Sequence, residues 1–257
     1  MRRQPHISSA VQDGLAPRVL LHHSRTLITE SIAPRLEDTR ELPNDDYSMV
    51  AGSYKGHRIT LVATHMGVDE SLNIVDQLAQ LGVNTFIKLG TFVSLMENMP
   101  LGEIRVPDAA VSLPSSVDAI LPRGQRPKPS KEVADCIMRT AQARGIDVKA
   151  GTVLTCPVYG PYIRDEVVDP IFSIDYWRPE CFGDEMECSA VFAAAAFSGA
   201  RSAAVLVCNR TWAVLDAYRR GHREDWTAHA NSETYVSQYD LAIDLALDSL
   251  IDCHCSS

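Results

Sequence analysis

Hydrophobic periodicity divides the chain into alternating strand-like and helix-like segments. Short apolar, β-branched runs bounded by glycine or polar residues predict strands. Longer segments with apolar residues every three or four positions predict helices. The predicted strands are 58–63, 85–89, 148–154 and 203–207, and the predicted helices are 71–81, 131–144, 186–197 and 232–250. This alternation is typical of an α/β fold.

Two segments add detail to this pattern. Residues 107–129 hold five prolines and little periodicity, which indicates irregular structure with short strands. Residues 186–197 are rich in alanine, so the helix predicted there can pack closely against a sheet. Repeats, low-complexity tracts and linkers are not visible in the sequence. We therefore expect one domain over residues 1–257.

Composition narrows the class of protein. A chain of 257 residues with 46% hydrophobic residues is long enough to bury a sizeable core. A formal net charge of -9 argues against nucleic acid or an acidic membrane as the main partner. Apolar runs fall short of the ~20 residues that span a bilayer, and the charged N-terminus is not followed by an apolar segment. We expect a cytoplasmic protein without a secretory signal.

Cysteine usage agrees with that compartment. The seven cysteines are odd in number and scattered, which is typical of reduced thiols in a cytoplasm. The segment Cys253-His254-Cys255 resembles a set of metal ligands. A second pair of ligands at suitable spacing is missing from the sequence, so we expect no metal site.

Carboxylates are concentrated in residues 183–190, Gly-Asp-Glu-Met-Glu-Cys-Ser-Ala. Glu185 and Glu187 are two positions apart, so they project to the same side at a strand end but diverge on a helix. A carboxylate held there can accept two hydrogen bonds from a vicinal diol, and Met186 can pack on the face of a sugar. The alternative is an acidic helix N-terminus that the helix dipole favours.

The same stretch resembles the Glu-Met-Glu signature of the nucleoside phosphorylase family, the branch of uridine phosphorylase and the hexameric purine nucleoside phosphorylases. Further similar segments follow the family's order at residues 5–7, 52–59, 64–67, 77–91 and 205–211. The resemblance implies a phosphorylase/hydrolase-like α/β fold, with a central twisted mixed sheet flanked by helices. It also implies an enzyme that cleaves a nucleoside N-glycosidic bond, with no cofactor other than phosphate as co-substrate.

The resemblance assigns the sugar site residue by residue. The second Glu of the signature binds the ribose hydroxyls and the Met packs on the sugar, which implies these roles for Glu187 and Met186. Glu185 and Thr91 are further expected substrate contacts. His6 corresponds to the family's N-terminal His, which reaches the sugar's 5' end across a dimer interface. The chain is then expected to form a homo-oligomer, either a dimer or a hexamer built as a trimer of dimers.

The residues expected to contact the base match the family's residues only in part. Arg164 aligns with the Arg that reads the uracil edge in uridine phosphorylases, and Tyr162 stands where the family has Gln. Asn209 and Arg210 match the Asn-Arg-Thr strand end of that branch. Purine-specific relatives have an Asp in place of Asn209, and a neutral amide donates a hydrogen bond but cannot deliver a proton. We therefore expect a pyrimidine-type or modified base. Structural ion pairs are the alternative for both arginines.

The residues expected to bind the nucleophile, phosphate or water, differ most from those of the family. His22 and His23 stand where the family has a glycine-containing loop, and a side chain there restricts both the backbone and the approach of an anion. Lys88 stands where the family has an Arg. A guanidinium can donate two parallel hydrogen bonds to one anion, whereas the lysine ammonium group is a single compact charge. The family residue Thr91 is retained.

These departures leave three hypotheses. In the first, a phosphorylase rebuilds its anion site from His22, His23, Ser24, Arg25, Lys88 and Thr91, with Gly67 as a further residue of the phosphate or nucleophile site. In the second, a hydrolase uses water, activated by Glu185 or by a neutral histidine. In the third, a non-catalytic relative binds a nucleoside or acts through its oligomer. The ribose-side residues are better retained than the others, and we take phosphorolysis as the leading hypothesis.

Overall fold

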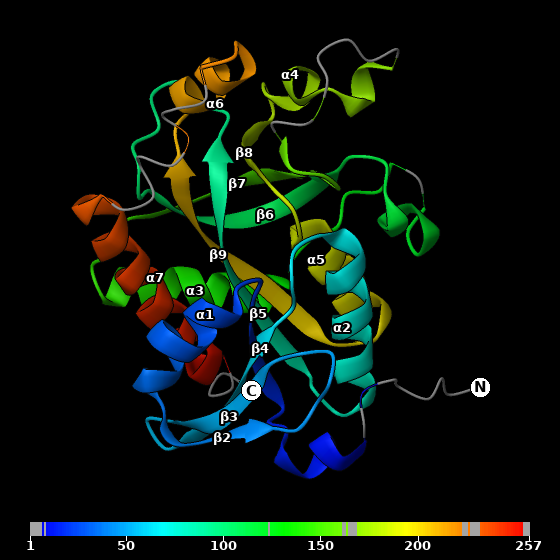
Figure 1. Cartoon of the computed structure of the whole chain (residues 1–257), viewed down its shortest axis with the longest axis vertical. Coiled ribbons are helices and arrows are strands. Elements are labelled where there is room, and N and C mark those ends of the chain that lie inside the picture. Colours follow the sequence, from blue (N-terminus) through cyan, green and yellow to red (C-terminus); the bar gives the residue numbers. More distant parts are fainter. Residues whose placement is uncertain are drawn as a thin grey trace.

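The computed structural model of the chain describes residues 7, 9–122, 124–160, 163, 169–222, 226 and 232–253. Its centre is a mixed nine-stranded sheet in the order β2-β3-β4-β1-β5-β8-β7-β6-β9 (Figure 1). The strands are β1 (Arg18–His22), β2 (Glu37–Leu42), β3 (Met49–Tyr54), β4 (His57–Ala63), β5 (Thr85–Ser94), β6 (Ile104–Ser112), β7 (Val148–Thr155), β8 (Cys181–Glu185) and β9 (Arg201–Arg210).

The helices are α1 (Arg25–Leu27), α2 (Val68–Gln80), α3 (Lys131–Ala143), α4 (Ile174–Trp177), α5 (Cys188–Phe197), α6 (Trp212–Arg219) and α7 (Glu233–Asp252). Short 3-10 or π-helical turns are η1 (Ser9–Gly14), η2 (Ile28–Ile32), η3 (Ala33–Arg35), η4 (Ser116–Ala119) and η6 (Pro170–Phe172). The predicted α/β class, with a central mixed sheet flanked by helices, is confirmed.

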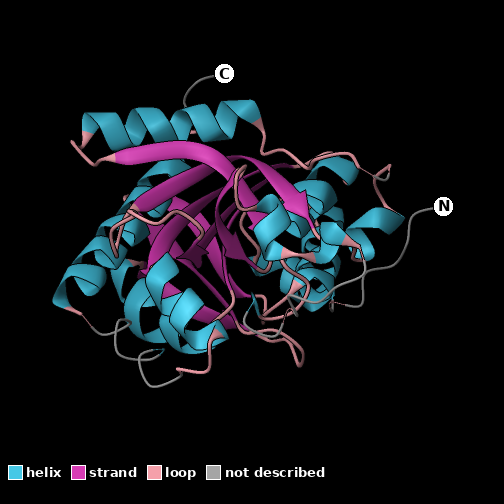
Figure 2. Cartoon of the chain, turned by 90° about the horizontal axis from the view of Figure 1, so that it is seen from above, coloured by secondary structure: helices cyan, strands magenta, loops and turns pink. Residues whose placement is uncertain are grey.

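Helices cover both faces of the sheet (Figure 2). On one face, Leu78 of α2 and Phe192 of α5 belong to one buried apolar cluster. On the other, Ile137 of α3 and Ile243 of α7 belong to a second cluster. Because both faces are covered, the inner strands are apolar on both sides, as the continuous apolar run of β9 indicates. The helix α5 is buried almost all round, which its alanines allow.

Strand β5 organises the sheet. It pairs in parallel with β1 and with β9, and its last residues pair antiparallel with β8, where Val93 lies opposite Asp184. From β8 the pairings continue through β7 and β6 to β9, which returns to β5, so these five strands close on themselves. This closure brings the carboxyl ends of β8 and β9 beside the second half of β5.

The predicted boundaries differ from the observed ones at a few places. Strand β5 continues to Ser94, well beyond the predicted 85–89, because β9 pairs with it as far as Val93 and β8 pairs with its last two residues. Helix α5 begins at Cys188, and Glu187 is its N-cap residue. Strand β6 enters the region predicted as irregular. Its Pro107 lies at a register shift in the pairing with β7, the kind of position that tolerates a residue without an amide hydrogen.

In the part of the chain that the structure describes, helices long and apolar enough to cross a membrane are absent.

Candidate active site

A pocket of about 190 Å³ opens where the ends of β8 and β9 meet the second half of β5. Residues from these strands, from the segments after β1, β4 and β7, and from the start of α5 surround it. The lining residues are His23, Met66, Thr91, Phe92, Val93, Tyr159, Gly160, Asp184, Glu185, Met186, Glu187, Asn209 and Arg210. The structure thus brings together most of the described residues that the sequence assigned to substrate binding.

Beside the pocket, one buried lysine pairs with two buried carboxylates. Lys88 Nζ lies 3.0 Å from Glu185 Oε2 and 3.2 Å from Glu187 Oε2. Burial acts to lower the pKa of Lys88, but the charges of Glu185 and Glu187 outweigh it and hold that pKa well above its ordinary value. Lys88 in turn lowers the pKa of Glu185 against the opposing effect of burial. The group carries two negative formal charges and one positive.

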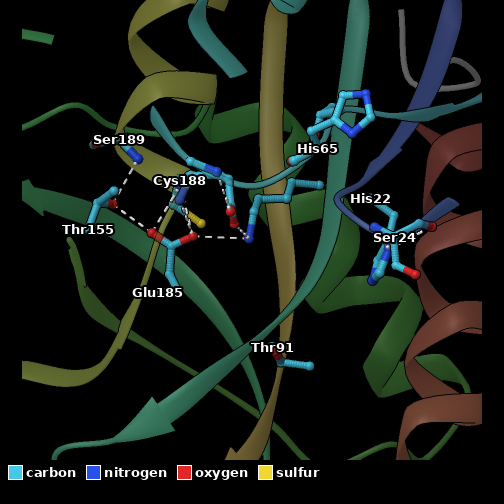
Figure 3. Close-up of polar contacts among 12 residues, drawn as sticks. His22, Ser24, His65, Thr91, Thr155, Glu185, Cys188 and Ser189 are labelled. Atoms are coloured by element: carbon cyan, nitrogen blue, oxygen red, sulfur yellow. Dashed lines mark hydrogen bonds and ion pairs between the residues drawn. The ribbon is translucent and has the colours of Figure 1, made fainter. Parts of the chain in front are cut away.

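Glu185 is hydrogen-bonded to the start of α5 (Figure 3). Its carboxylate accepts hydrogen bonds from Thr155 Oγ1 at 2.6 Å, from the Glu187 amide at 2.8 Å and from the Cys188 amide at 2.9 Å. Thr155 Oγ1 also accepts from the Ser189 amide at 3.0 Å. These contacts satisfy amides of the first turn that lack a partner within the helix. Sequence reasoning placed Glu185 against the substrate. Glu185 does line the pocket, and its oxygens also accept from these donors and face Lys88, which gives it a positioning role as well.

Glu187 is held from two sides. One carboxylate oxygen, Oε1, accepts a hydrogen bond from the Gly67 amide at 3.0 Å, and the other faces Lys88. Gly67 has φ +111°, a conformation that favours glycine, and it caps α2. The sequence assigned Gly67 to the nucleophile, but its amide is committed to Glu187. Met186 and Met66 lie at the same pocket, so a carboxylate and two thioethers form one end of it.

The two histidines differ in their positions. The His22 ring is buried and stacks on His23 with 4.4 Å between ring centroids. Its Nδ1 accepts from the Ser24 amide at 2.8 Å, and its Nε2 lies 2.8 Å from the Tyr239 hydroxyl oxygen. Burial lowers the pKa of both rings, that of His22 well below its ordinary value, so both are neutral at pH 7. His23 lines the pocket and His22 does not.

Arg25 is separated from this site. It lines a different hollow, about 450 Å³ in volume, together with the acidic residues Asp45 and Asp46. The expectation that Arg25, His22 and Lys88 jointly face an anion is therefore not met. Arg25 lines the other hollow, His22 is hydrogen-bonded to Tyr239, and Lys88 forms ion pairs with carboxylates. Of the donors predicted for the nucleophile, His23 and Thr91 line the pocket.

Asn209 and Arg210 also line the pocket, and both already have partners. Asn209 Nδ2 donates to Thr91 Oγ1 at 2.9 Å. Arg210 Nε donates to the Trp226 carbonyl at 2.9 Å, and its guanidinium lies 4.4 Å from the centroid of the Trp226 ring. The predicted substrate contacts His6, Tyr162 and Arg164 lie outside the described residues.

Sequence reasoning missed several pocket residues. Asp184, Tyr159, Phe92 and Met66 all line it, and Asp184 is almost fully buried. The only available signal was that Asp184 directly precedes the Glu-Met-Glu stretch at a strand end. Among the described residues, groups of three or more His, Cys, Asp or Glu side chains that could hold a metal ion are absent.

Comparison with known proteins places this geometry in a family. Residues 24–239 match the family model described as the Phosphorylase superfamily. The purine nucleoside phosphorylase of Vibrio cholerae is 25% identical over 256 residues, which cover 96% of both chains. The guanosine phosphorylase of Halorubrum lacusprofundi is 24% identical over 80% of this chain and 82% of that protein. The uridine phosphorylase of Haemophilus influenzae is 25% identical over 52% of this chain and 53% of its own length.

Solved structures share the fold. The purine nucleoside phosphorylase of Toxoplasma gondii, in complex with immucillin-H, superimposes with a TM-score of 0.83 at 20% identity, covering 100% of this chain and 98% of that one. The uridine phosphorylase of Vibrio fischeri gives a TM-score of 0.78 at 21% identity and covers 98% of both chains. Because the family model spans most of the sequence, the chain belongs to the Phosphorylase superfamily.

Proposed function

We propose that this chain catalyses the phosphorolysis of a nucleoside, which releases the free base and forms a sugar 1-phosphate. The observation that carries the proposal is the position of Glu187, a buried carboxylate held by the Gly67 amide and Lys88 at the edge of the pocket. Family membership supports the same chemistry, since the relatives that align with this chain are named uridine, guanosine and purine nucleoside phosphorylases.

The sugar occupies the end of the pocket formed by Glu187, Met186 and Met66. The remaining lone pairs of the Glu187 carboxylate accept hydrogen bonds from vicinal sugar hydroxyls, and the thioethers pack on the sugar face. Two fixed contacts hold Glu187 in place before the substrate arrives, so little reorganisation is needed. As the glycosidic bond breaks, positive charge develops on the sugar. The excess negative charge of the Lys88–Glu185–Glu187 group stabilises that charge.

Phosphate is the co-substrate, and no other cofactor is required. His23 and Thr91 are the described nucleophile-side residues that line the pocket and carry hydrogen-bonding groups. Lys88 acts indirectly, because it offsets one of the two carboxylates beside it. Family membership favours phosphate over water as the nucleophile.

The remaining assignments complete the proposal. Arg210 and Asn209 border the base, with Arg164 and Tyr162 as further base contacts, and a pyrimidine-type or modified base fits the neutral Asn209. His6 of a neighbouring copy reaches the sugar in a homo-oligomer, a dimer or a hexamer. The chain acts in the cytoplasm as one nucleoside phosphorylase-like domain over residues 1–257.

The test is base release from pyrimidine, purine and 5'-modified nucleosides, each measured with and without phosphate. We expect release only with phosphate, together with a sugar 1-phosphate product. Equal release without phosphate, with free sugar as the product, would identify water as the nucleophile. A chain that releases no base, and whose Tm does not rise with millimolar nucleosides, would contradict nucleoside cleavage altogether.

A further inference from the structure

Asp184 is a buried carboxylate in the pocket that the reaction described above does not use. It is the penultimate residue of β8, and only 3% of its surface is exposed. In the described part of the chain, its Oδ1 has no hydrogen-bond partner, although the residue lines the pocket. A buried polar atom without a partner is costly, so a site that retains one at a pocket wall is prepared for a ligand group.

The backbone around Asp184 leaves room for this carboxylate. A Cβ atom at Gly160 would lie 2.5 Å from Asp184 Oδ2, so a residue larger than glycine at that position would displace the side chain. On the opposite side, Val93 of β5 pairs with Asp184 across the sheet. The carboxylate therefore lies against Gly160, in the segment that follows β7, and the charge of Arg210, which lines the same pocket, acts on it.

The charged and titratable groups around Asp184 favour its protonated form. Burial is the largest effect and raises the pKa of Asp184 to about 7, and the neighbouring Glu185 charge acts in the same direction. Its own backbone amide and Arg210 of β9 oppose the rise. Among the described residues that directly follow β7, up to Gly160, the titratable groups are Cys156 and Tyr159, whose pKa values burial also raises, so they stay neutral. Near neutral pH the carboxyl group of Asp184 therefore exists both as acid and as carboxylate.

Asn209 and Arg210, which line the same pocket, are poorly suited to donate a proton. Asn209 has one Nδ2 hydrogen committed to Thr91, and its buried Oδ1, which lacks a partner among the described residues, is an acceptor. Arginine side chains do not release a proton in proteins, and Arg210 has its Nε bound to the Trp226 carbonyl. A departing base carries the electron pair of the broken bond and leaves faster when a proton neutralises it.

We propose that Asp184 is the general acid of this pocket, contacting the base of the bound nucleoside and donating its carboxyl proton to a ring nitrogen or carbonyl oxygen of that base. This inference rests on the proposed function. As the C1'–N bond breaks, its electron pair passes to the base, which takes the Asp184 proton. A phosphate oxygen forms the new bond to C1'. The Asp184 carboxylate regains a proton from solvent when the base leaves.

This role widens the substrate class. The expectation of a pyrimidine-type base relied on Asn209 being unable to deliver a proton. An acid at Asp184 supplies that proton from a different strand, so purine nucleosides, whose bases depart most readily when protonated, become substrates of the same pocket.

The experiment compares wild-type protein with Asp184→Asn, which preserves the shape of the side chain but has no acidic proton. Two kinds of substrate are used, each with phosphate: the nucleoside that the wild type cleaves fastest, and p-nitrophenyl riboside, whose leaving group needs no proton. We expect the substitution to lower kcat/KM on the nucleoside by about 10²-fold or more, and to change it by less than about threefold on the aryl riboside. Asp135→Asn, at a surface position whose side chain is 47% exposed, serves as the matched control.

The pH profile gives a second readout. Because the acid form is active, wild-type kcat/KM on the nucleoside should fall as pH rises through about 7, the pKa of Asp184, and Asp184→Asn should lack this fall. Wild-type rates and profile in the variant would overturn the proposal, as would an equal loss on both substrates, since that indicates a structural role. A wild type that cleaves neither substrate would refute the proposed function itself and Asp184's role with it.

Discussion

Lys88 and Glu185 form a buried ion pair, with 3.0 Å between Nζ and Oε2, that joins the middle of β5 to the end of β8. The same ammonium group reaches Glu187 at 3.2 Å. Burial would be costly for any one of these charges alone, and their mutual attraction keeps both Lys88 and Glu185 ionised. One lysine thus holds both the carboxylate of Glu185, which accepts from the first amides of α5, and the carboxylate of Glu187 at the edge of the pocket.

Replacing Lys88 by Met should strongly destabilise the protein. The substitution leaves two buried carboxylates without a compensating charge, and breaking a buried pair in this way costs about 3–5 kcal/mol. We expect a corresponding loss in the free energy of unfolding, measured by urea denaturation at pH 7. The double variant Lys88→Met with Glu185→Gln should recover part of the loss, because one uncompensated charge is removed.

An exposed lysine provides the control for this prediction. Lys131 pairs with Asp135 at the surface, and 86% of its side chain is exposed. Lys131→Met should cost less than about 1 kcal/mol, as is usual for surface ion pairs. Equal effects of the two lysine substitutions would show that the buried group contributes nothing beyond an ordinary surface pair.

Glu187→Gln should lower kcat much more than it changes KM for the nucleoside. The amide keeps the size of the side chain but loses the negative charge, which stabilises the positive sugar of the transition state more than the neutral ground state. We expect kcat to fall by about 10²- to 10³-fold, and Glu187→Ala to abolish measurable turnover. Steady-state kinetics with saturating phosphate provide the measurement. Exposed Glu132→Gln is the control, and wild-type kinetics for Glu187→Gln would remove Glu187 from the site.

The pH dependence of stability should report on Asp184 without any substrate. Its folded-state pKa of about 7 lies above the ordinary value of 3.8, so the folded protein holds the proton more tightly than the unfolded chain. The resulting stabilisation is present below pH 4 and is lost as pH rises to about 7. Relative to wild type, Asp184→Asn should therefore gain up to about 4 kcal/mol between pH 4 and pH 8, at about 1.4 kcal/mol per pKa unit. Parallel urea-denaturation curves at all pH values would contradict this assignment.

Tyr239→Phe should destabilise the protein through His22. Without the hydroxyl group, the buried His22 Nε2 loses its partner at 2.8 Å, and an unpaired buried polar group costs about 1–3 kcal/mol. Chemical denaturation at pH 8, where His22 is neutral, measures this loss. Tyr176→Phe, at an exposed position, should stay within about 0.5 kcal/mol of wild type. A similarly small effect of Tyr239→Phe would mean that His22 does not depend on this contact.

Much of the fold could be predicted from the sequence because local periodicity records which face of an element is buried. The helix predicted at 131–144 is observed as Lys131–Ala143, and the strand predicted at 148–154 as Val148–Thr155. The continuation of β5 to Ser94 could not be predicted, because it depends on pairing with β9 and β8, which are far away in the chain.

The candidate site, like the fold, could be predicted from the sequence only in part. The sequence by itself determined that two carboxylates and a thioether stand together at the start of a predicted helix, since Glu185, Met186 and Glu187 are adjacent residues. That a strand, β8, ends at Glu185 was decided by the tertiary structure. The sequence also determined membership of a family, since similar segments recur in a fixed order along the chain.

Only the tertiary structure decided what those groups do. It paired Lys88 with the carboxylates, moved Arg25 to a separate hollow, and buried Asp184 at the pocket wall. Charge state and hydrogen-bonding capacity depend on burial and on distances through space, and these arise when distant segments pack together. The sequence shows which ionisable groups are present. Their partners and their pKa values depend on how β5 packs beside β8 and β9.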